Sequence, residues 1–413
     1  MNAEIIAVGS ELLLGQIANT NGQYLSQELA SIGINVYRHT VVGDNKKRMT
    51  SAFQEACERA DILFITGGLG PTEDDLTKEV TAELTGKRLM YHQPTLDFMK
   101  QFFKQRKRTM SENNKKQAHY TEGSDVFYNR AGLACGMADN YKDTLLILVP
   151  GPPRELKHMY ENTIKPYLLK ELAGEFLVLS RVLRFFDIGE SRLEEELIDI
   201  IQAQTNPTIA PLASDGEVTI RLTAKAKTRS EADVLLDKVE TQIQQRVGKY
   251  FYGRENETLP VQVVKNYGKK GVTLSAAESL TGGWFAKQLV DVAGASAMFE
   301  GSSTVYSQSA KNKVLGISHD LMDKYGTISK ECAEAMADKV RLQYQTDIGI
   351  SFTGAAGPEP LEGKDPGTVW IGISGPNGVT SYALNLAGSR ELIRRLAVYY
   401  GCWFLLKEKV VNK

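Results

Sequence analysis

Two stretches of the chain carry the same pattern, an apolar run that ends in Thr-Gly and is followed two residues later by Gly-Pro. They are DILFITGGLGPTEDD at residues 61–75 and DIGISFTGAAGPEP at residues 347–360. Glycine amides can approach an anion closely, so both turns are suited to a phosphate group. Only the first stretch continues into an acidic cluster that includes Asp74 and Asp75. The two stretches therefore indicate two sites with different chemistry.

The acidic cluster indicates a divalent metal. Carboxylates repel phosphate unless a cation lies between them, and hard cations such as Mg²⁺ are held by one or two carboxylates together with substrate phosphate oxygens. We therefore predict a metal-assisted phosphate site in which Asp74 and Asp75 hold the metal and act in catalysis. The glycines expected to bind the substrate are Gly67, Gly68 and Gly70. The alternative is that the acids only stabilise the N terminus of a helix that begins near Pro71 or Thr72.

Polar residues after two other apolar runs could join this site. Glu11 and Asn21 follow the first run of the chain, AEIIAVG, and Arg154 follows TLLILVPG. Glu11 could orient a ribose or a metal, and Arg154 could pair with a phosphate. We predict that all three residues contribute to substrate binding.

Ser279, in SAAESLTGG, lies between an apolar run and a helical pattern. As a nucleophile it would have the amides of Gly282 and Gly283 free to bind an oxyanion or a phosphate, with Thr281 beside them. The alternative is that the serine only caps the helix. A Ser-His-Asp triad is disfavoured, because the nearby histidine, His319, stands alone in a loop-like segment.

Tyr306 and Lys311, in TVYSQSAK, are the candidate bases for such a serine. A lysine whose pKa falls on burial can accept a proton, whereas an exposed lysine would have no such role. Thr353 and Gly354 end a neighbouring apolar run, so we expect their hydroxyl and amide to face the same crevice.

The elements that must position these residues alternate between strands and helices. Residues 1–169 and residues 254–413 each show this alternation, which predicts two α/β domains, the first with a mostly parallel sheet covered by helices on both faces. Ligands of such sheets bind at the carboxyl ends of the strands, where the glycines lie. Residues 170–253 predict a small α+β module that is KH-like in outline but lacks the GxxG loop that clamps a nucleic-acid backbone.

Length and composition restrict the class of protein. The 413 residues exceed the roughly 250–300 at which single cores stop growing, so two or three domains are expected. The formal net charge of -1 gives no general attraction to nucleic acid. The four cysteines stand far apart, which disfavours a zinc site or disulfides and favours a reducing, cytoplasmic location. The longest late apolar run is about half of the ~20 residues that a membrane span needs, so no membrane insertion is expected.

These motifs, in this order, resemble those of the CinA family of competence- and damage-inducible proteins over essentially the whole chain. Residues 1–169 are similar to molybdopterin-binding domains of the MoaB/MogA type, a three-layer fold, through GSELLLGQIANTN, VVGDN, TGGLGPTEDDLT and PGPPRE. Residues 254–413 are similar to nicotinamide-nucleotide amidases of the PncC type through AESLTGG, VYSQSAK, TGAAGP and GSRELIRR. The chain departs from the family pattern at residues 359–363, where EPLEG stands in place of a glycine pair.

The resemblance implies two hydrolytic activities. For the first domain it implies ADP-ribose pyrophosphatase activity with a divalent metal such as Mg, Mn or Co, which would release AMP and ribose 5-phosphate. For the last domain it implies deamidation of nicotinamide mononucleotide to nicotinate mononucleotide and ammonia, without a cofactor. The residues that the resemblance assigns to the amidase are the nucleophile Ser279, its activating partners Tyr306 and Lys311, and the nucleotide contacts Thr353 and either Arg390 or Arg394.

The resemblance further implies a homodimer whose ligands are small nucleotides, with no membrane or nucleic-acid partner. The alternative, from a different functional class, is a molybdopterin-binding-like or competence-related interaction protein that has lost catalysis. We favour the enzyme because a decayed site should lose its polar residues first, and Ser279, Lys311, Asp74 and Asp75 are all present.

Overall fold

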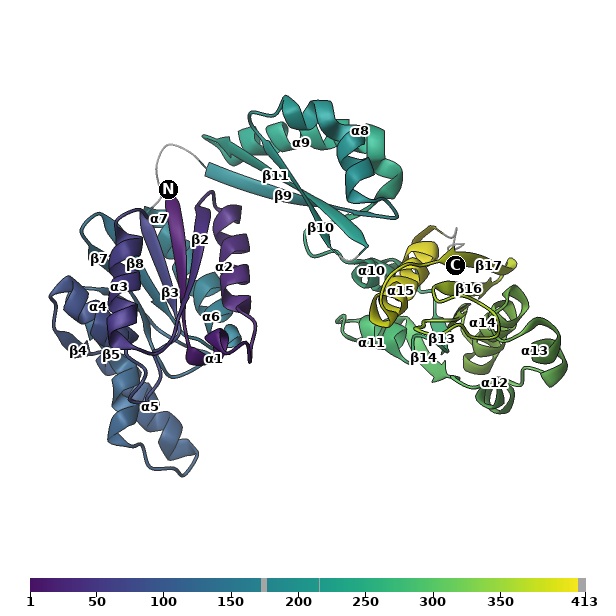
Figure 1. The fold of residues 1–413 in the computed structure, drawn as a ribbon, viewed down its shortest axis with the longest axis horizontal. Helices are drawn as coiled ribbons and strands as arrows, with labels where there is room; N and C mark the ends of the chain where they lie inside the picture. Colours follow the sequence, from purple (N-terminus) through teal and green to yellow (C-terminus); the bar gives the residue numbers. More distant parts are fainter. Residues whose placement is uncertain (172–176, 215, 408–413) are drawn as a thin grey trace. The chain divides into compact units, whose positions relative to one another are not determined.

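The computed structural model describes residues 1–171, 177–214 and 216–407. The chain divides into two compact units, one of residues 1–180 with 223–237 and the other of residues 181–222 with 238–413. Helices pack on parallel-rich or mixed sheets, which confirms the predicted α/β class (Figure 1). The domain boundaries expected after residues 169 and 253 stay predictions.

A six-stranded sheet forms the centre of the first unit. Its order is β2 (Asn35–Val42), β1 (Asn2–Val8), β3 (Ile62–Thr66), β8 (Thr144–Val149), β7 (Gly136–Tyr141) and β6 (Asp125–Phe127). The first four strands are parallel, whereas β7 and β6 are antiparallel additions at one edge. The prediction of a mostly parallel sheet is therefore confirmed.

Both faces of this sheet are covered by helices. Ile5 of β1 belongs to the core beneath α2 (Thr20–Ser31) and α6 (Pro153–Met159), whereas the next residue, Ile6, belongs to the core beneath α3 (Lys46–Cys57). Neighbouring residues of a strand point to opposite faces, so a strand buried on both faces reads as a continuous apolar run. This is why ILFIT, the sequence of β3, is buried throughout.

The acidic cluster lies in a turn rather than in a helix. The helix expected near Pro71 or Thr72 begins later, since α4 spans Thr77–Thr85. Asp75 accepts a hydrogen bond from the Thr72 amide at 2.9 Å and another from the Thr72 hydroxyl. Such local bonding competes with helical hydrogen bonds and favours a turn. The alternative in which the acids stabilise a first helical turn is therefore wrong.

The described residues of this part of the chain form seven further elements. They are α1 (Ser10–Leu13), β4 (Leu89–Tyr91), α5 (Gln93–Gln105), η1 (Glu112–Ala118), β5 (His119–Thr121), η2 (Tyr160–Ile164) and α7 (Lys165–Glu171). β4 and β5 form a separate two-stranded ribbon.

The middle of the chain has the α+β content that its sequence predicts. Its four strands pair in the order β10 (Thr208–Ser214), β11 (Glu217–Ala226), β9 (Leu177–Phe186) and β12 (Phe251–Arg254). Its helical elements are α8 (Glu190–Gln202), α9 (Arg229–Val247) and the short η3 (Gly248–Tyr250). The alternating burial along β11 is the pattern of a strand with one face toward a core.

The last part of the chain contains a five-stranded sheet. Its order is β14 (Phe299–Thr304), β13 (Leu274–Glu278), β15 (Ile348–Gly354), β16 (Thr368–Gly375) and β17 (Gly378–Asn385). β14, β13 and β15 are parallel, whereas β16 and β17 are antiparallel. The carboxyl ends of β13 and β15 carry the two motifs SAAESLTGG and TGAAGP.

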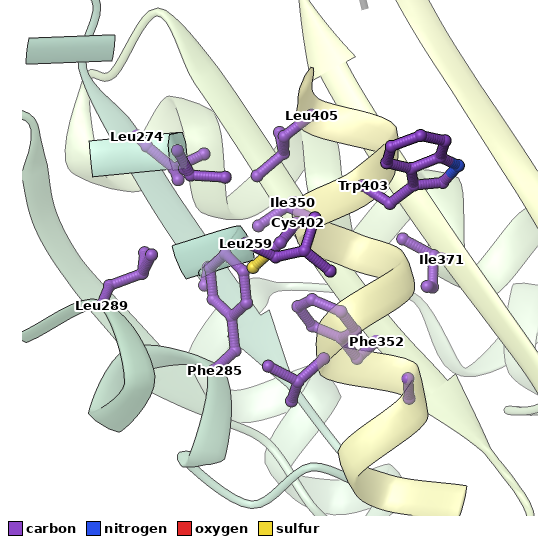
Figure 2. Close-up of a cluster of buried hydrophobic side chains, with 14 of the residues drawn as sticks. Leu259, Leu274, Phe285, Leu289, Ile350, Phe352, Ile371, Cys402, Trp403 and Leu405 are labelled. Carbon is purple, nitrogen blue, oxygen red and sulfur yellow. The ribbon is translucent and has the colours of Figure 1, made fainter. Parts of the chain in front are cut away.

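Two cores hold this second sheet between its helices. On one face, α10 (Leu259–Lys270), α11 (Trp284–Val290) and α15 (Arg390–Lys407) contribute to a cluster in which Phe285, Phe352 and Cys402 meet (Figure 2). On the other face, Met336 of α14 (Lys330–Tyr344) belongs to a cluster with Ala277 of β13. The helices α12 (Gln308–Leu315) and α13 (His319–Tyr325) complete this second side.

In residues 1–171, 177–214 and 216–407, no helix combines the length and the apolar character that a membrane crossing needs.

Candidate active sites

A cavity of about 560 Å³ lies at the carboxyl ends of β1, β3 and β8. The turn after β3 contributes Gly67, Gly68 and Gly70 to its wall, and the following loop contributes Asp74 and Asp75. Glu11 and Asn21, which follow β1, also line it. The structure therefore brings most of the residues predicted for the first site into one cavity.

Glycine is required in the turn at two positions. Both Gly67 and Gly68 have positive φ angles, 100° and 65°. A Cβ atom on Gly67 would lie 2.2 Å from the Val8 carbonyl oxygen, and one on Gly68 would lie 2.2 Å from the Thr77 hydroxyl oxygen. Only a residue without a side chain fits both the backbone conformation and the contact. The turn can thus present bare backbone to a ligand.

The two aspartates of the turn differ in their surroundings. Asp75 lies against Gly70, and one of its carboxylate oxygens is held by Thr72. Asp74 is exposed, and the polar groups of Thr72 and of its own backbone lower its pKa below the ordinary value. The Asp75 side chain is therefore anchored to the turn by one oxygen, and its second oxygen accepts no hydrogen bond from the described residues.

The cavity is strongly acidic. Its carboxylates are Glu11, Asp44, Asp74, Asp75 and Glu155. Among the described residues that line it there is no lysine or arginine. A phosphate-bearing ligand would be repelled here unless a cation accompanied it.

A divalent metal fits this donor set, with part of its coordination left to other oxygens. In residues 1–171, 177–214 and 216–407, no group of three His, Cys, Asp or Glu side chains comes together as metal ligands would. Asp74 and Asp75 both line the cavity, and one or two carboxylates is the number that Mg²⁺ uses when substrate phosphates and water supply the rest.

Of the predicted binding residues Asn21 and Arg154, only Asn21 lines the cavity. The Asn21 amide nitrogen donates to the Gly151 carbonyl at 2.6 Å and to the Thr66 hydroxyl at 3.0 Å. Its amide oxygen is buried and has no partner among the described residues, which suits it to a ligand donor. Arg154, in contrast, is exposed and does not line the cavity. At the start of α6 it is the next residue, Glu155, that faces inward, so the prediction for Arg154 is not supported.

Sequence reasoning missed Asp44 and Glu155 as cavity residues. Asp44 follows β2, and its carboxylate accepts hydrogen bonds from the amide and the hydroxyl of Ser10, both at 2.8 Å. Both acids stand in motifs that carry the resemblance, VVGDN and PGPPRE. The signal that could have identified them is thus their place in these two motifs, beside Gly43 and Arg154.

The second site centres on Ser279 and Lys311. The Lys311 ammonium nitrogen lies 2.9 Å from the Ser279 hydroxyl oxygen and 3.0 Å from the Val305 carbonyl oxygen. The serine follows β13 directly, and the lysine comes from α12, so the two meet across the carboxyl end of the sheet. The alternative in which Lys311 is exposed is wrong, because only 1% of the residue is accessible.

Burial gives this lysine the character of a base. Removal from water disfavours the charged form, and this lowers the pKa of Lys311 below its ordinary value of 10.5, although the neighbouring Cys332 and Glu362 oppose the shift. Ser279 is itself 7% accessible, so its hydroxyl meets substrate only through the cavity. The pair has the geometry of a nucleophile with its activating base.

Ser279 is not a helix cap, and the amides of Gly282 and Gly283 are not free. α11 begins at Trp284, with Gly283 as its N-terminal cap residue. The Gly282 amide donates to the Ser279 carbonyl at 3.1 Å, and the Gly283 amide donates to the Glu278 carboxylate at 2.9 Å. The prediction that these two amides bind an oxyanion or phosphate is therefore wrong.

The Glu278 carboxylate accepts a hydrogen bond that we expected a ligand to accept. Its fully buried carboxylate accepts hydrogen bonds from the amides of Gly283, Phe285 and Ala286 and from the Ser302 hydroxyl, at 2.9 to 3.1 Å. A carboxylate at a helix N terminus satisfies amides that lack helical partners. Sequence reasoning missed this role, although the residue stands next to the nucleophile in AAES.

A cavity of about 270 Å³ opens beside Ser279. Leu280 lines it, and no described residue accepts a hydrogen bond from the Leu280 amide. The amide that follows a nucleophile is a common oxyanion donor, so Leu280 replaces the two glycines as our candidate. Ala356 and Gly357, from the turn after β15, also line the cavity, and their amides likewise have no acceptor in the described structure.

Tyr306 does not bring its hydroxyl to the nucleophile. Its side chain is 62% exposed, and its hydroxyl accepts a hydrogen bond from Arg390 at 3.1 Å. What reaches Ser279 is the Tyr306 backbone carbonyl, which accepts from the serine hydroxyl at 3.4 Å. The prediction of Tyr306 as an activating side chain is therefore not supported, and the residue lines the cavity instead.

The two candidate arginines have separate positions. Arg390 lines the cavity and donates to the Gly357 carbonyl at 2.6 Å as well as to Tyr306. Arg394 donates to the carbonyls of Leu280 and Thr281 at 2.8 and 2.9 Å. Its guanidinium thus holds the turn that follows the nucleophile, which leaves Arg390 as the arginine placed for a ligand.

The other predicted contacts lie around the same turn. Thr353 and Gly354 line the cavity, but the Thr353 hydroxyl donates to the Thr327 carbonyl at 2.6 Å. Thr281 is fully buried, does not line the cavity, and its hydroxyl has no partner among the described residues. Thr353 thus supports the cavity wall, and Thr281 does not contact the cavity.

The segment in which the chain departs from the family pattern forms part of this wall. Glu359 and Leu361 line the cavity. Glu362 accepts hydrogen bonds from the amides of Thr327 and Ile328 at 2.7 and 3.2 Å. EPLEG therefore connects two walls of the cavity.

Three family models match successive segments of the chain. Residues 4–170 match the "Probable molybdopterin binding domain" family, residues 180–253 match the damage-inducible protein CinA KH domain, and residues 256–409 match the CinA C-terminal domain. A solved structure described as the protein CinA with unknown function, from Thermoplasma acidophilum, is 30% identical, with a TM-score of 0.37 over 40% of this chain and 98% of that one.

Full-length relatives extend the match to the whole chain. A competence-damage inducible protein of Bacillus velezensis is 51% identical over 98% of this chain and 97% of its own length. A protein of the same description from Bacillus cereus is 52% identical over 99% of both chains. With three matched segments in the same order and half of all residues identical over nearly the full length, the chain belongs to the CinA family of competence- and damage-inducible proteins.

Proposed function

We propose that this protein is a bifunctional hydrolase of pyridine-nucleotide metabolism. The last domain would deamidate nicotinamide mononucleotide, and the first would hydrolyse ADP-ribose. The observation that carries the proposal is the contact of 2.9 Å between the buried Lys311 amine and the Ser279 hydroxyl. A buried base at a serine beside a small cavity suits acyl transfer, and an interaction protein would have no need of it.

Carboxamide hydrolysis can proceed in two steps at this pair. Neutral Lys311 takes the Ser279 proton as the serine oxygen attacks the amide carbon, and the Leu280 amide faces the oxyanion that forms. Protonated Lys311 then returns the proton to the leaving nitrogen, the C–N bond breaks, and ammonia departs. Lys311 next takes a proton from water as the water oxygen attacks the ester carbon. The bond from that carbon to the serine oxygen then breaks, Lys311 returns the proton to the serine oxygen, and nicotinate mononucleotide is released.

The phosphate of the mononucleotide would bind at the opposite wall of the cavity. The Ala356 and Gly357 amides have no acceptor in the described structure, and the Arg390 guanidinium adds a positive charge beside them. Backbone amides together with one arginine are a common way of holding a phosphate. This assignment moves the predicted phosphate contact from Gly282 and Gly283 to the turn after β15.

A second function is favoured by the acidic cavity of the first domain. Five carboxylates line this cavity, and none of its described lining residues is a lysine or an arginine. A cation is therefore needed before a pyrophosphate can enter. A divalent metal held by Asp74 and Asp75 would neutralise charge on the pyrophosphate as a bridging P–O bond breaks. The Gly67–Gly70 turn would hold the phosphates, and the buried Asn21 oxygen would accept a hydrogen bond from the substrate.

One experiment tests both halves of the proposal. The purified full-length protein is incubated with nicotinamide mononucleotide or with ADP-ribose, each with added Mg²⁺, Mn²⁺ or Co²⁺ and with a chelator. We expect ammonia from the first substrate regardless of chelator, and AMP from the second only when metal is present. Turnover of neither substrate would contradict the enzymatic proposal and favour an interaction protein.

A further inference from the structure

Glu155 is held in the wall of the first cavity by residues outside its own helix. It lies in the first turn of α6 and lines the cavity. One of its carboxylate oxygens, Oε2, accepts a hydrogen bond from the Asn129 amide nitrogen at 2.7 Å. Asn129 is 3% accessible and is itself fixed by the Ala131 amide and the Ala134 carbonyl, both at 3.0 Å. A buried, fully bonded asparagine thus sets the position of one acid.

The Glu155 carboxylate also lies against Gly132, which has no side chain. A Cβ atom on Gly132 would lie 2.0 Å from Glu155 Oε2, so any other residue there would displace the carboxylate. Among the described residues, Glu155 takes part in no ion pair, and its second oxygen, Oε1, receives no hydrogen bond. The carboxylate is therefore held on one side only and can accept a proton on the other.

A helix-stabilising role does not account for this arrangement. An acid in the first turn of a helix interacts favourably with the helix dipole wherever its side chain lies along that turn. That interaction requires neither a buried asparagine from a distant loop nor a glycine beneath the carboxylate. Both features instead fix the direction of one carboxylate toward the cavity, as expected for a group that must meet a reacting atom.

Glu155 is also separate from the pair of acids that would hold a metal. Asp74, Asp75 and Glu155 all line the cavity, but no three acids in the described part of the chain come together as a metal-binding group. A carboxylate in the same cavity, apart from the metal pair and without a cationic partner, is placed to act on water.

We propose that Glu155 is the general base of the first site, an inference that rests on the proposed hydrolysis of ADP-ribose. Glu155 takes a proton from water as the water oxygen forms a bond to one phosphorus of the pyrophosphate. The bond from that phosphorus to the bridging oxygen breaks, and the bridging oxygen leaves on the other phosphate. The products are AMP and ribose 5-phosphate, and the proton on Glu155 passes to solvent. Asn129 acts as a positioning residue that directs the carboxylate.

The test compares Glu155→Gln and Glu155→Ala with the wild type and with Glu161→Gln, a matched change in the neighbouring η2 segment outside the cavity. Glutamine keeps the hydrogen bond from Asn129 but cannot accept a proton. We expect kcat for AMP formation to fall about 10²- to 10⁴-fold in both Glu155 variants and to stay unchanged in Glu161→Gln. AMP, measured by calorimetry, should bind at least as tightly as to the wild type, because one negative charge is removed from the cavity, and the Tm should remain that of the wild type. Added formate should restore part of the rate of Glu155→Ala.

The possible results distinguish a failure of the proposed ADP-ribose hydrolysis from a failure of the proposed role of Glu155. Wild-type protein that releases no AMP with any of the metals would overturn the ADP-ribose activity and the role of Glu155 with it. An active wild type with a Glu155→Gln rate within about twofold would overturn the role of Glu155 alone. A loss of rate accompanied by an equal loss of AMP affinity or by a lower Tm, without rescue by formate, would likewise show a structural role.

Discussion

At the scale of single residues, the amidase proposal depends on the protonation of Lys311. A lysine accepts a proton only when it is neutral, and burial lowers the pKa of Lys311 below 10.5. The neutral fraction grows as pH rises through that lowered pKa. Ammonia release should therefore increase with pH, with the midpoint of the rise below pH 10.5. The measurement is the pH dependence of kcat for nicotinamide mononucleotide.

Two substitutions check that the rise belongs to this lysine. Lys311→Arg keeps a positive charge that cannot be lost in this range, so we expect ammonia release to fall at every pH. Lys313→Met, an exposed change on the same helix, should leave the profile of the wild type. An unchanged profile in Lys311→Arg would remove Lys311 as the base.

A second prediction at the scale of single residues concerns Glu278 and the stability of the last domain. Glu278→Gln would turn one acceptor oxygen into an NH₂ group facing backbone amides, and at least one buried donor would lose its partner. We expect the free energy of unfolding of the last domain to fall by about 1–3 kcal/mol. The three tryptophans, Trp284, Trp370 and Trp403, all lie in this domain, so urea unfolding followed by their fluorescence reports on this domain and on Phe186, which packs against Trp403. Glu300→Gln, an exposed neighbour, is the control and should unfold like the wild type.

At the scale of elements, the turn after β3 depends on glycine for two separable reasons. Gly68 and Gly86 have similar φ angles, 65° and 70°, but a Cβ atom would meet Thr77 at Gly68 and nothing within 4 Å at Gly86. Gly86→Ala should therefore cost only the conformational strain, about 1 kcal/mol, whereas Gly68→Ala should cost about 2–4 kcal/mol because the contact adds to it. Scanning calorimetry measures both, and equal costs would show that the contact with Thr77 is unimportant.

The arrangement of the elements was largely predictable from the sequence, whereas the bonding inside the turns was not. Strands such as ILFIT are continuous apolar runs, so their place in a sheet buried on both faces follows from composition. The glycines and Ser279 could be placed at strand ends for the same reason. Residue types do not show which acceptor a backbone amide will bond to. The hydrogen bond from the Gly283 amide to the Glu278 carboxylate was therefore not predicted.

Side-chain direction was the other unpredictable quantity. Tyr306 was expected at the nucleophile, but its hydroxyl meets Arg390 and only its backbone carbonyl reaches Ser279. Arg154 and Glu155 are adjacent in sequence, and the helical turn directs only the acid into the cavity. Such choices depend on packing between elements distant in sequence, which periodicity does not reveal.

At the scale of the whole molecule, one chain carries two cavities that differ in the charged groups lining them. The first is lined by five carboxylates, and the second offers Arg390 and uncommitted amides. The first should therefore need a metal, and the second should not. We expect Asp75→Asn to lose AMP formation but to release ammonia at the wild-type rate, and Ser279→Ala to show the reverse. Assays of both products on both variants test this, and loss of both activities in either variant would contradict independent sites.

The most direct test of the central claim is to trap the acyl-enzyme. Wild-type protein and Ser279→Ala are mixed with nicotinamide mononucleotide, quenched in acid during turnover and examined by mass spectrometry of intact protein and peptides. Our account predicts a nicotinate mononucleotide acyl group on Ser279 in the wild type, and neither adduct nor ammonia from the variant. Ammonia release by Ser279→Ala at the wild-type rate, or an acyl group on another residue, would contradict it.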